Sequence, residues 1–298
     1  MINRTNEART ALQGKVTMVT GANAGMGKEI ACALAKMGAT VVMVSRDLGR
    51  GEAARAEVQA QSGNDAVELL LADLSSQQSI RHLVQEFTAR HAQLHVLVNN
   101  VGVTLPRRSV TVDGLETVFA TNHLAPFLLT NLLLPVLKAS APARVVTVSS
   151  GAHSMGKINF DDLQSEQSYR EIRVYNQSKL ASMLFSYELA RRLAGTGVTA
   201  NVLEPGFVKT NMAVPFPFSL FSAMRVSAEQ GAQPAIYLAS SPDVEGVSGK
   251  YFSHKGVATN SSKVSYDESI ARRLWQISAE LTQLPTDLQS SRREAARD

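Results

Sequence analysis

The chain has 298 residues, 44% of them hydrophobic, and a formal net charge of +4 at pH 7. It is long enough to bury a sizeable core, in one large α/β domain or two smaller ones. The basic residues are spread along the chain, apart from short clusters at 190–193 and 291–297, so the charge predicts a solvated surface and no nucleic-acid partner. The single cysteine, Cys32, excludes an intrachain disulfide framework and is compatible with a reducing compartment.

The two ends of the chain and its most apolar stretch bear on localisation. Residues 1–13 are polar and lack the apolar core of a secretion signal. The apolar stretch 124–137 is short and interrupted, so we interpret it as a buried helix or a subunit interface. We expect a cytoplasmic protein with no integral membrane segment. With no repeat or linker inside 14–284, that range is expected to be one domain, and 1–13 and 285–298 are expected to be loosely ordered tails.

Short apolar, β-branched runs alternate with helical segments along the chain. Strands are expected at 15–20, 39–45, 66–73, 94–100, 143–150 and 197–205, with a seventh at 249–253. Near-continuous apolar strands separated by helices are typical of a parallel sheet covered on both faces. The predicted fold class is α/β, a single-domain Rossmann-type doubly wound parallel sheet with ligands bound beyond the carboxyl ends of its strands.

The segment TGANAGMG (20–27) joins the first expected strand to a helix. Gly21, Gly25 and Gly27 allow a tight turn and a close approach to a pyrophosphate, which the N–H groups of the helix N-terminus would bind. In this strand–turn–helix context the segment predicts nucleotide binding, and the alternative is a turn that only connects the two elements.

The end of the second strand bears on the choice of cofactor. A carboxylate there would bind a ribose 2′-hydroxyl, but Ser45 occupies that position and Arg46 follows it. Arg46 can pair with a 2′-phosphate, which favours NADP(H) over NAD(H). Asp47 can reach the ribose or cap the next helix. The alternative for Arg46 is an exposed arginine on a loop.

Polar residues also follow the third and fourth strands. Asp73 can accept a hydrogen bond from an adenine amino group or serve as a helix-entry residue. Asn99 can hold the turn after the fourth strand, and Gly102 allows a nucleotide to approach. Both are also ordinary turn residues.

Tyr175 and Lys179 are four residues apart in a segment with helical periodicity, 174–194, so they share a helix face. A nearby ammonium favours the phenolate and lowers the tyrosine pKa from about 10, which makes the phenol a better acid or base. The alternative is an ordinary solvated face. Ser149 and Ser150 end the fifth strand, and Ser150, further past the strand end, is the one expected to hold a substrate oxygen.

These motifs together resemble the short-chain dehydrogenase/reductase superfamily. The matching segments, in order over 14–284, are TGANAGMG, NNVG, TNHLAPF, VSSGAH, YNQSK and PGFVKT. The resemblance is strongest to the branch of retinol dehydrogenases and related carbonyl reductases. It implies a catalytic tetrad of Asn122, Ser150, Tyr175 and Lys179. Tyr175 would be the general acid or base, Ser150 would orient the carbonyl, Lys179 would lower the tyrosine pKa and bind the nicotinamide ribose, and Asn122 would hold a relay water.

The same resemblance implies a set of cofactor-binding residues along the strand ends. In addition to Tyr175 and Lys179, the set comprises Gly21, Asn23, Gly25, Met26, Gly27, Ser45, Arg46, Asp73, Leu74, Asn100, Val101, Gly102, Pro205, Gly206, Val208 and Thr210. Two residues depart from the family pattern. Val101 replaces the usual alanine, and Glu204 stands where this branch often has histidine. Residues 1–13 also lack the membrane anchor of many retinol dehydrogenases, which weakens the case for a retinoid substrate.

The Phe- and Pro-rich segment near 211–226 corresponds to the variable substrate lid of the family. Phe216, Phe218 and Phe221 are expected to line an apolar substrate cleft. The alternative is a hydrophobic interface or membrane-touching patch. His153 and Phe207 are further candidates for substrate contact, although His153 can also be an incidental loop residue.

The expected function is NADP(H)-dependent interconversion of a small apolar ketone or aldehyde and its alcohol. The alternatives are an NAD(H)-dependent secondary alcohol, hydroxysteroid or retinol dehydrogenase, and a catalytically silent nucleotide-binding protein. A homodimer or homotetramer is expected through the apolar helices at 112–140 and 174–194. No metal site is expected, because His82, His91 and His95 lie on or near one helix without cysteine partners.

Overall fold

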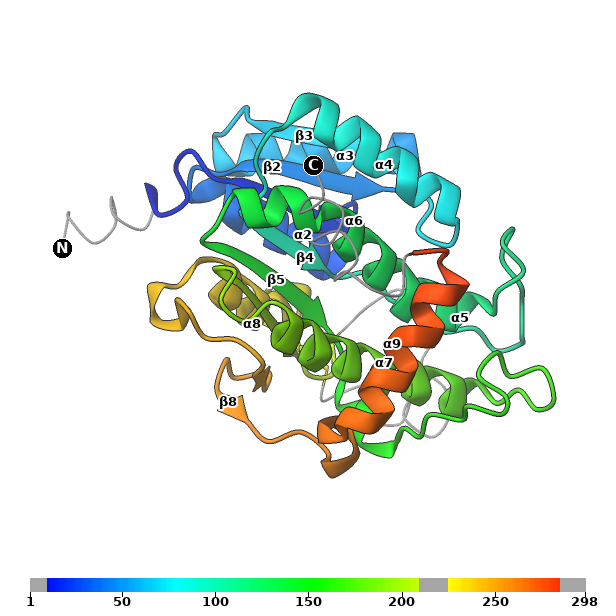
Figure 1. Ribbon diagram of the computed structural model, residues 1–298. Coiled ribbons are helices and arrows are strands. Elements are labelled where there is room, and N and C mark those ends of the chain that lie inside the picture. Colours follow the sequence, from blue (N-terminus) through cyan, green and yellow to red (C-terminus); the bar gives the residue numbers. More distant parts are fainter. Residues whose placement is uncertain (1–9, 209–224, 285–298) are drawn as a thin grey trace, which may run out of the picture.

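A single sheet organises the computed structural model, which describes residues 10–208 and 225–284. Among these residues the sheet has eight strands in the order β3-β2-β1-β4-β5-β6-β7-β8 (Figure 1). The strands are β1 Val16–Thr20, β2 Thr40–Ser45, β3 Val67–Leu71, β4 Val96–Asn99, β5 Ala143–Val148, β6 Val198–Leu203, β7 Tyr251–Phe252 and β8 Ala258–Thr259.

The strands from β3 to β7 are all parallel to their neighbours, and only the β7–β8 pair is antiparallel. The predicted doubly wound α/β fold and its seven expected strands are therefore confirmed. Strand β8 was not expected, because its two exposed residues are too few to form a recognisable apolar pattern. The strand order reverses between β1 and β4, which is the position where such sheets open a ligand crevice.

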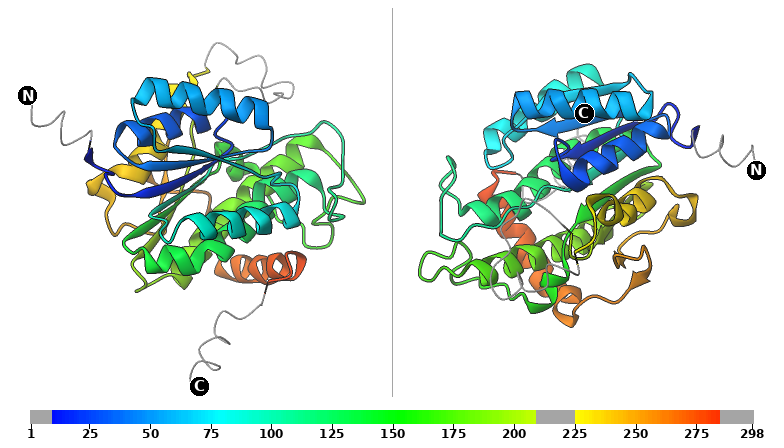
Figure 2. Two further views of the ribbon diagram at one scale, coloured as in Figure 1. Left: turned by 90° about the horizontal axis from the view of Figure 1, so that it is seen from above. Right: turned by 180° about the vertical axis from the view of Figure 1, so that it is seen from behind.

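Helices cover both faces of the sheet. They are α2 Gly25–Lys36, α3 Leu48–Ser62, α4 Gln77–Arg90, α5 Thr117–Phe119, α6 Ala125–Ala139, α7 Glu171–Arg192, α8 Ala228–Ser240 and α9 Glu268–Leu281. Shorter turns are η1 Ala120–Leu124, η2 Gly151–Met155, η4 Pro242–Val244 and η5 Lys263–Tyr266. Helices α2, α3 and α8 pack on one face, and α4, α6 and α7 on the other (Figure 2). The near-continuous apolar strands are explained by this two-sided cover.

Helix α9 forms an additional layer outside α6 and α7 (Figure 2). Its buried Trp275 packs edge-on against Phe127 of α6 at 4.8 Å and stacks with Phe185 of α7 at 5.9 Å, both between ring centroids. The Arg192 guanidinium lies 4.3 Å from the centre of the same indole ring. Trp275 therefore fastens the C-terminal helix to the two most apolar helices of the chain.

This arrangement bears on the expected subunit interface at 112–140 and 174–194. Every residue of α7 from 176 to 189 is buried within the chain, and most of α6 is buried as well. The segment Thr117–Ala139 is long and apolar enough to cross a membrane, but most of it lies inside the fold. Because α9 and the sheet already cover these helices, they leave little apolar surface for a second subunit. The prediction of a buried helix at 124–137 is confirmed.

Candidate active site

The carboxyl ends of the central strands bring the predicted motifs to one edge of the sheet. Gly21 follows β1, Asn100 follows β4, Ser150 is two residues beyond β5, and Glu204 follows β6. Since these strands are parallel neighbours, their carboxyl ends lie side by side. Segments far apart in the sequence therefore meet in one crevice.

The backbone of the glycine turn packs so close to its neighbours that side chains at Gly21 and Gly27 would clash. Gly21 and Gly25 have φ values of +66° and +54°, in the left-handed region that favours glycine. A Cβ at Gly27 would lie 2.2 Å from the Gly21 carbonyl oxygen, and one at Gly21 would lie 2.8 Å from the Val101 side chain. Only glycine allows the backbone to close the turn in this way.

The start of α2 fits a phosphate-bearing cofactor. Ala24 precedes α2 in extended conformation, and no side chain caps the helix. The first N–H groups and the positive end of the helix dipole are thus available to an anion. Beside the turn, the Asn100 amide donates to the Thr20 carbonyl at 2.9 Å, while its buried Oδ1 has no partner among the described residues. Asn23 and Met26 are both part of this turn and half-buried.

Three polar residues at and just after the end of β2 have different roles. Ser45 is buried, and its hydroxyl bonds the backbone of Asp47. Asp47 caps α3 by accepting from the Arg50 N–H at 2.8 Å, and this bond does most to lower the pKa of its carboxyl. Arg46 is exposed, and its guanidinium has no bonded partner in the described part of the chain. Asp47 is therefore a helix cap, and Arg46 is available to a ligand.

The ends of β3 and β4 supply the remaining cofactor candidates. Asp73 uses one carboxylate oxygen to accept from both the N–H and the hydroxyl of Ser75, at 2.9 and 2.7 Å. Leu74 packs against the core beneath it. After β4, the Val101 side chain packs against Gly21, and a Cβ at Gly102 would lie 3.1 Å from the Lys179 ammonium. Asp73 thus shapes its own turn, while Gly102 joins the nucleotide crevice to the tetrad.

Two other members of the predicted tetrad, Tyr175 and Asn122, lie near the Lys179 ammonium. Its Nζ donates to the Val148 carbonyl at 3.3 Å and lies 5.7 Å from the centre of the Tyr175 ring. The point where Gly102 would carry a Cβ is 3.8 Å from the Asn122 Oδ1. Lys179 is only 4% exposed, and Tyr175 is half-buried. The pair is not a solvated helix face.

The two serines after β5 have different roles. Ser149 is buried, and its hydroxyl donates to the Lys179 backbone carbonyl at 3.0 Å. Ser150 is half-buried, and its hydroxyl interacts with the Tyr175 phenol and accepts from the Ala152 N–H at 3.2 Å. Ser149 anchors α7, and Ser150 is the serine that faces the tyrosine.

Asn122 lies in the π turn η1, an irregular turn of the kind often found at functional sites. Its amide donates to the Val103 carbonyl and the Ser178 hydroxyl, both at 2.9 Å, and its Oδ1 accepts from the Val103 N–H at 2.7 Å. The Ser182 hydroxyl donates to the Asn122 carbonyl at 3.1 Å. Ser178 and Ser182 were not expected to have roles. Their spacing of four places them on one face of α7, but the sequence does not reveal that Asn122 lies opposite.

Burial dominates the acid–base properties of the tetrad. It lowers the pKa of Lys179 from 10.5 to about 8, because the charged amine is removed from water. It also raises the pKa of Tyr175, while the hydrogen bond to Ser150 acts in the opposite direction. The expected net lowering of the tyrosine pKa by Lys179 is therefore wrong for this arrangement. The desolvated phenolate is disfavoured, and the ammonium 5.7 Å from the ring centre does not compensate.

Replacing Lys179 with methionine is expected to increase the free energy of unfolding at pH 7 while abolishing turnover. Burial of the charged amine destabilises the folded chain. This destabilisation has its full size below the folded pKa of about 8. The destabilisation declines as the pH rises from about 8 through 10.5, above which lysine is neutral in both the folded and the unfolded chain. Urea unfolding of both proteins across this range measures the difference. A gain that does not shrink with rising pH would contradict the assignment to charge.

The substrate side of the crevice begins after β6. Pro205 and Gly206 turn the chain, and Gly206 has a φ of +78°. The Phe207 carbonyl accepts from the Val226 N–H at 2.9 Å, and Val208 is buried against Gly231 of α8. The residues on each side of the expected lid are thus joined at its base. Thr210, Phe216, Phe218 and Phe221 lie outside the described residues.

His153 has internal partners for both ring nitrogens. Its Nδ1 bonds the Ser150 carbonyl at 2.7 Å, and its Nε2 accepts from the Ser262 N–H at 3.3 Å. The ring is 3% exposed and packs against Tyr251 at 5.1 Å between centroids. Because Nδ1 faces a carbonyl and Nε2 faces an N–H, Nδ1 acts as the donor and Nε2 as the acceptor. His153 connects the Ser150 loop to the loop after β8, a role that its position in the sequence did not indicate.

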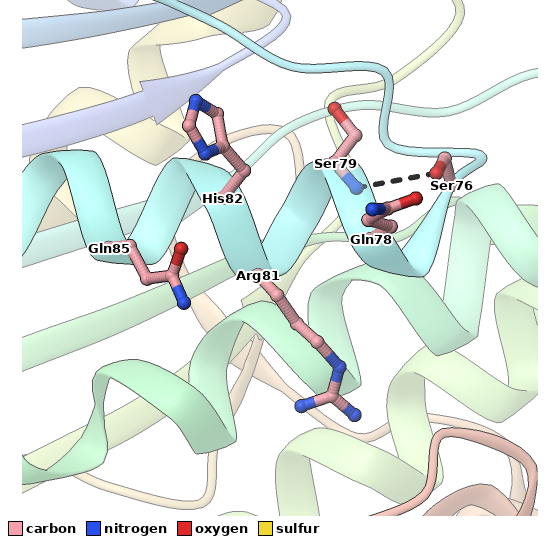
Figure 3. A pocket seen from close by; sticks show the side chains of 6 residues that line it. All are labelled: Ser76, Gln78, Ser79, Arg81, His82 and Gln85. Carbon is pink, nitrogen blue, oxygen red and sulfur yellow. Dashed lines mark hydrogen bonds between the residues drawn. The ribbon is translucent and has the colours of Figure 1, made fainter.

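A separate open hollow of about 540 Å³ lies along α4. Figure 3 shows its lining, which consists of Ser76, Gln78, Ser79, Arg81, His82 and Gln85. Arg81 donates to the Thr282 carbonyl at 2.7 Å, so its charge serves to hold the end of α9. Of the other two histidines considered above, His91 pairs with Glu68, and His95 accepts from the Val16 N–H. This hollow contains no tetrad residue.

Comparison with known proteins gives a consistent result. The family model described as short chain dehydrogenase matches residues 15–217. The chain is 46% identical over 275 residues to retinol dehydrogenase 12 of Mus musculus, covering 91% of this chain and 87% of the relative. It is 45% identical over 281 residues to retinol dehydrogenase 11 of Homo sapiens, covering 93% and 88%.

Solved structures agree with this fold. A putative uncharacterized protein from Mycobacterium paratuberculosis has a TM-score of 0.77 at 35% identity, covering 93% of this chain and 96% of the other. The Pseudomonas aeruginosa RhlG/NADP active-site complex has a TM-score of 0.69 at 29% identity, covering 84% and 98%. The chain therefore belongs to the short-chain dehydrogenase/reductase family and is an NAD(P)-dependent oxidoreductase.

Proposed function

We propose that the protein is an NADP(H)-dependent carbonyl reductase that interconverts a ketone or aldehyde and its alcohol. The observation that carries the proposal is the convergence of Tyr175, Asn122 and Gly102 around the buried Lys179 ammonium. When bound, the nicotinamide supplies or accepts the hydride. The protein's own residues then have to hold the substrate oxygen and move one proton.

The side chains support a simple division of labour. The Tyr175 hydroxyl gives its proton to the carbonyl oxygen in reduction and takes it back in oxidation. Its raised pKa keeps the phenol protonated at neutral pH, as a proton donor requires. The Ser150 hydroxyl, next to this phenol, orients the same oxygen. Lys179, with a pKa of about 8, can pass a proton toward the tyrosine after each turnover.

The exposed Arg46 supports NADP(H) as the cofactor. An arginine just after β2 can form two parallel hydrogen bonds to a ribose 2′-phosphate, whereas a carboxylate would be needed to bind a 2′-hydroxyl. Asp47, the nearest carboxylate, is engaged as the cap of α3. The solved RhlG complex contains NADP, which agrees with this proposal.

Replacing Arg46 with aspartate is expected to shift the ratio of kcat/KM for NADPH over NADH by about 10- to 100-fold toward NADH, the effect of losing charged hydrogen bonds. Steady-state rates with both cofactors measure the ratio. Arg55→Ala is the control, because Arg55 lies on α3 and pairs with Glu52. An unchanged ratio in Arg46→Asp would refute the cofactor proposal.

Substrate and cellular context are also proposals. The Phe-rich composition of segment 211–226 supports a medium-sized carbonyl compound with an apolar body as the substrate. Retinol oxidation is the second candidate, because the curated relatives are retinol dehydrogenases. We propose a cytoplasmic location, supported by the burial of Thr117–Ala139. A homodimer or homotetramer would have to use surfaces other than the covered faces of α6 and α7.

A further inference from the structure

A second cavity, wide open to solvent and of about 400 Å³, begins one residue beyond Ser150. Its walls are formed by the loops that follow β5, β6 and β8. Tyr251 of β7 completes the lining. Its lining residues are Gly151, His153, Ser154, Glu204, Tyr251, Asn260, Ser261 and Ser262. Apart from the glycine, every one of them carries a polar side chain. These side chains offer hydrogen-bond donors and acceptors to a polar group.

Glu204 is the charged group of this cavity. Its side chain is 22% exposed, and its Oε2 lies so close to Gly151 that a Cβ there would be 2.7 Å away. Its Oε1 lies 3.6 Å from the His254 Nδ1. The missing side chain at Gly151 thus leaves room for the carboxylate at the mouth of the cavity.

Tyr251 keeps its proton and interacts with this carboxylate. Burial raises the pKa of the Tyr251 phenol, and the Glu204 charge and hydrogen bond raise it further. The protonated phenol therefore acts as a donor to Glu204. A carboxylate has about four acceptor positions, so the contacts with Tyr251 and His254 leave acceptor capacity facing the cavity.

The opposite wall is held rigidly and has an unused hydroxyl. Ser261 bonds both the Tyr187 hydroxyl at 2.7 Å and the Ser265 hydroxyl at 2.6 Å. The neighbouring Ser262 N–H is bound by His153, yet the buried Ser262 Oγ has no partner among the described residues. This oxygen is buried behind the wall, so the polar group that a ligand would meet is the Glu204 carboxylate.

We propose that this cavity is a polar subsite of the active site that receives a hydroxyl or ammonium group of the substrate, with Glu204 as the hydrogen-bond acceptor. The inference rests on the proposed function, since it places the substrate carbonyl at Ser150 and Tyr175. The preferred substrates are then carbonyl compounds with an apolar body and one hydrogen-bond donor at a defined distance from the carbonyl.

The test uses straight-chain methyl ketones of increasing length, each compared with partners that carry a terminal hydroxyl or a terminal ammonium. In the wild-type protein, kcat/KM for the substituted ketone should exceed that for the plain ketone by about 10- to 100-fold at one chain length, the effect of one charged hydrogen bond. Glu204→Leu should remove this preference, so that the ratio of kcat/KM for the substituted over the plain ketone falls to about one, whatever the rate on plain ketones.

Glu204→Gln separates the two kinds of substituent and keeps the side-chain shape. Its amide oxygen still accepts from a hydroxyl but no longer attracts an ammonium, so the ammonium preference should vanish while part of the hydroxyl preference remains. Glu229→Gln, an exposed carboxylate on α8, is the matched control and should behave as wild type. Thermal unfolding of each variant verifies that it is folded.

The outcomes distinguish the subsite from the proposed function. Turnover of plain ketones without any preference at any chain length overturns the subsite alone. Equal losses on plain and substituted ketones in Glu204→Leu also overturn it, because they indicate a general role of the charge. No turnover of any ketone by the wild-type protein with either cofactor overturns the proposed function and the subsite together.

Discussion

Replacing Tyr175 with phenylalanine is expected to lower kcat for carbonyl reduction by about 10²–10⁴-fold, the contribution of a positioned general acid. The variant keeps the ring that lies 5.7 Å from the Lys179 ammonium and loses only the hydroxyl that faces Ser150. Cofactor binding should change little, because the glycine turn and Arg46 are untouched. Single-turnover rates and cofactor fluorescence titration measure the two effects separately.

A matched control for this variant is Tyr237→Phe. Tyr237 lies on α8 against Phe252, on the other face of the sheet from α7, and its loss of a hydroxyl should leave kcat unchanged. If Tyr175→Phe retained the wild-type rate, the acid–base assignment would be wrong. If the variant bound cofactor normally but had no turnover, while the wild-type protein had turnover, the result would exclude a silent nucleotide-binding role for the wild-type protein.

Replacing Trp275 with alanine is expected to lower the free energy of unfolding by about 3–5 kcal/mol, the usual range for a buried tryptophan. Its indole is 4% exposed and fills the space between Phe127, Phe185 and Arg192. Removing it leaves a cavity between α9 and the α6–α7 pair and loosens the helix that covers them. Urea unfolding followed by circular dichroism measures the loss.

The control for Trp275→Ala is on the same helix. Arg272 is exposed and pairs with Glu268 one turn away, so Arg272→Ala should change the free energy of unfolding by less than about 0.5 kcal/mol. Light scattering adds a second measurement. Trp275→Ala should associate more than the wild-type protein, since the apolar faces of α6 and α7 become exposed. A stable, unassociated variant would contradict the role given to α9.

Local patterns were sufficient to predict the sheet and much of the site. Continuous apolar runs such as 39–45 and 143–150 correspond to β2 and β5 because a strand buried on both faces needs apolar residues throughout. Gly27 was recognisable because the turn before a helix tolerates no Cβ there. Helical spacing placed Tyr175 and Lys179 on one face, and the resemblance to the family then predicted their role.

Other features depend on contacts between distant segments. The different contacts of the two serines, Ser149 with the Lys179 carbonyl and Ser150 with the Tyr175 phenol, depend on how α7 packs. The π turn at Asn122 is held by Ser178 and Ser182, more than fifty residues away. The raised pKa of Tyr175 reflects burial, which depends on everything packed around the phenol. No local pattern records these relations.

The amino-acid sequence by itself determined the α/β fold and predicted the nucleotide crevice and the acid–base pair, because each prediction follows from residues close together in the chain. Only the tertiary structure decided that α9 covers α6 and α7, that His153 braces the Ser150 loop, and that Glu204 faces a polar cavity. The physical reason is the same in each case. Burial, hydrogen-bond partners and charge environment are set by segments that meet only after the chain has folded.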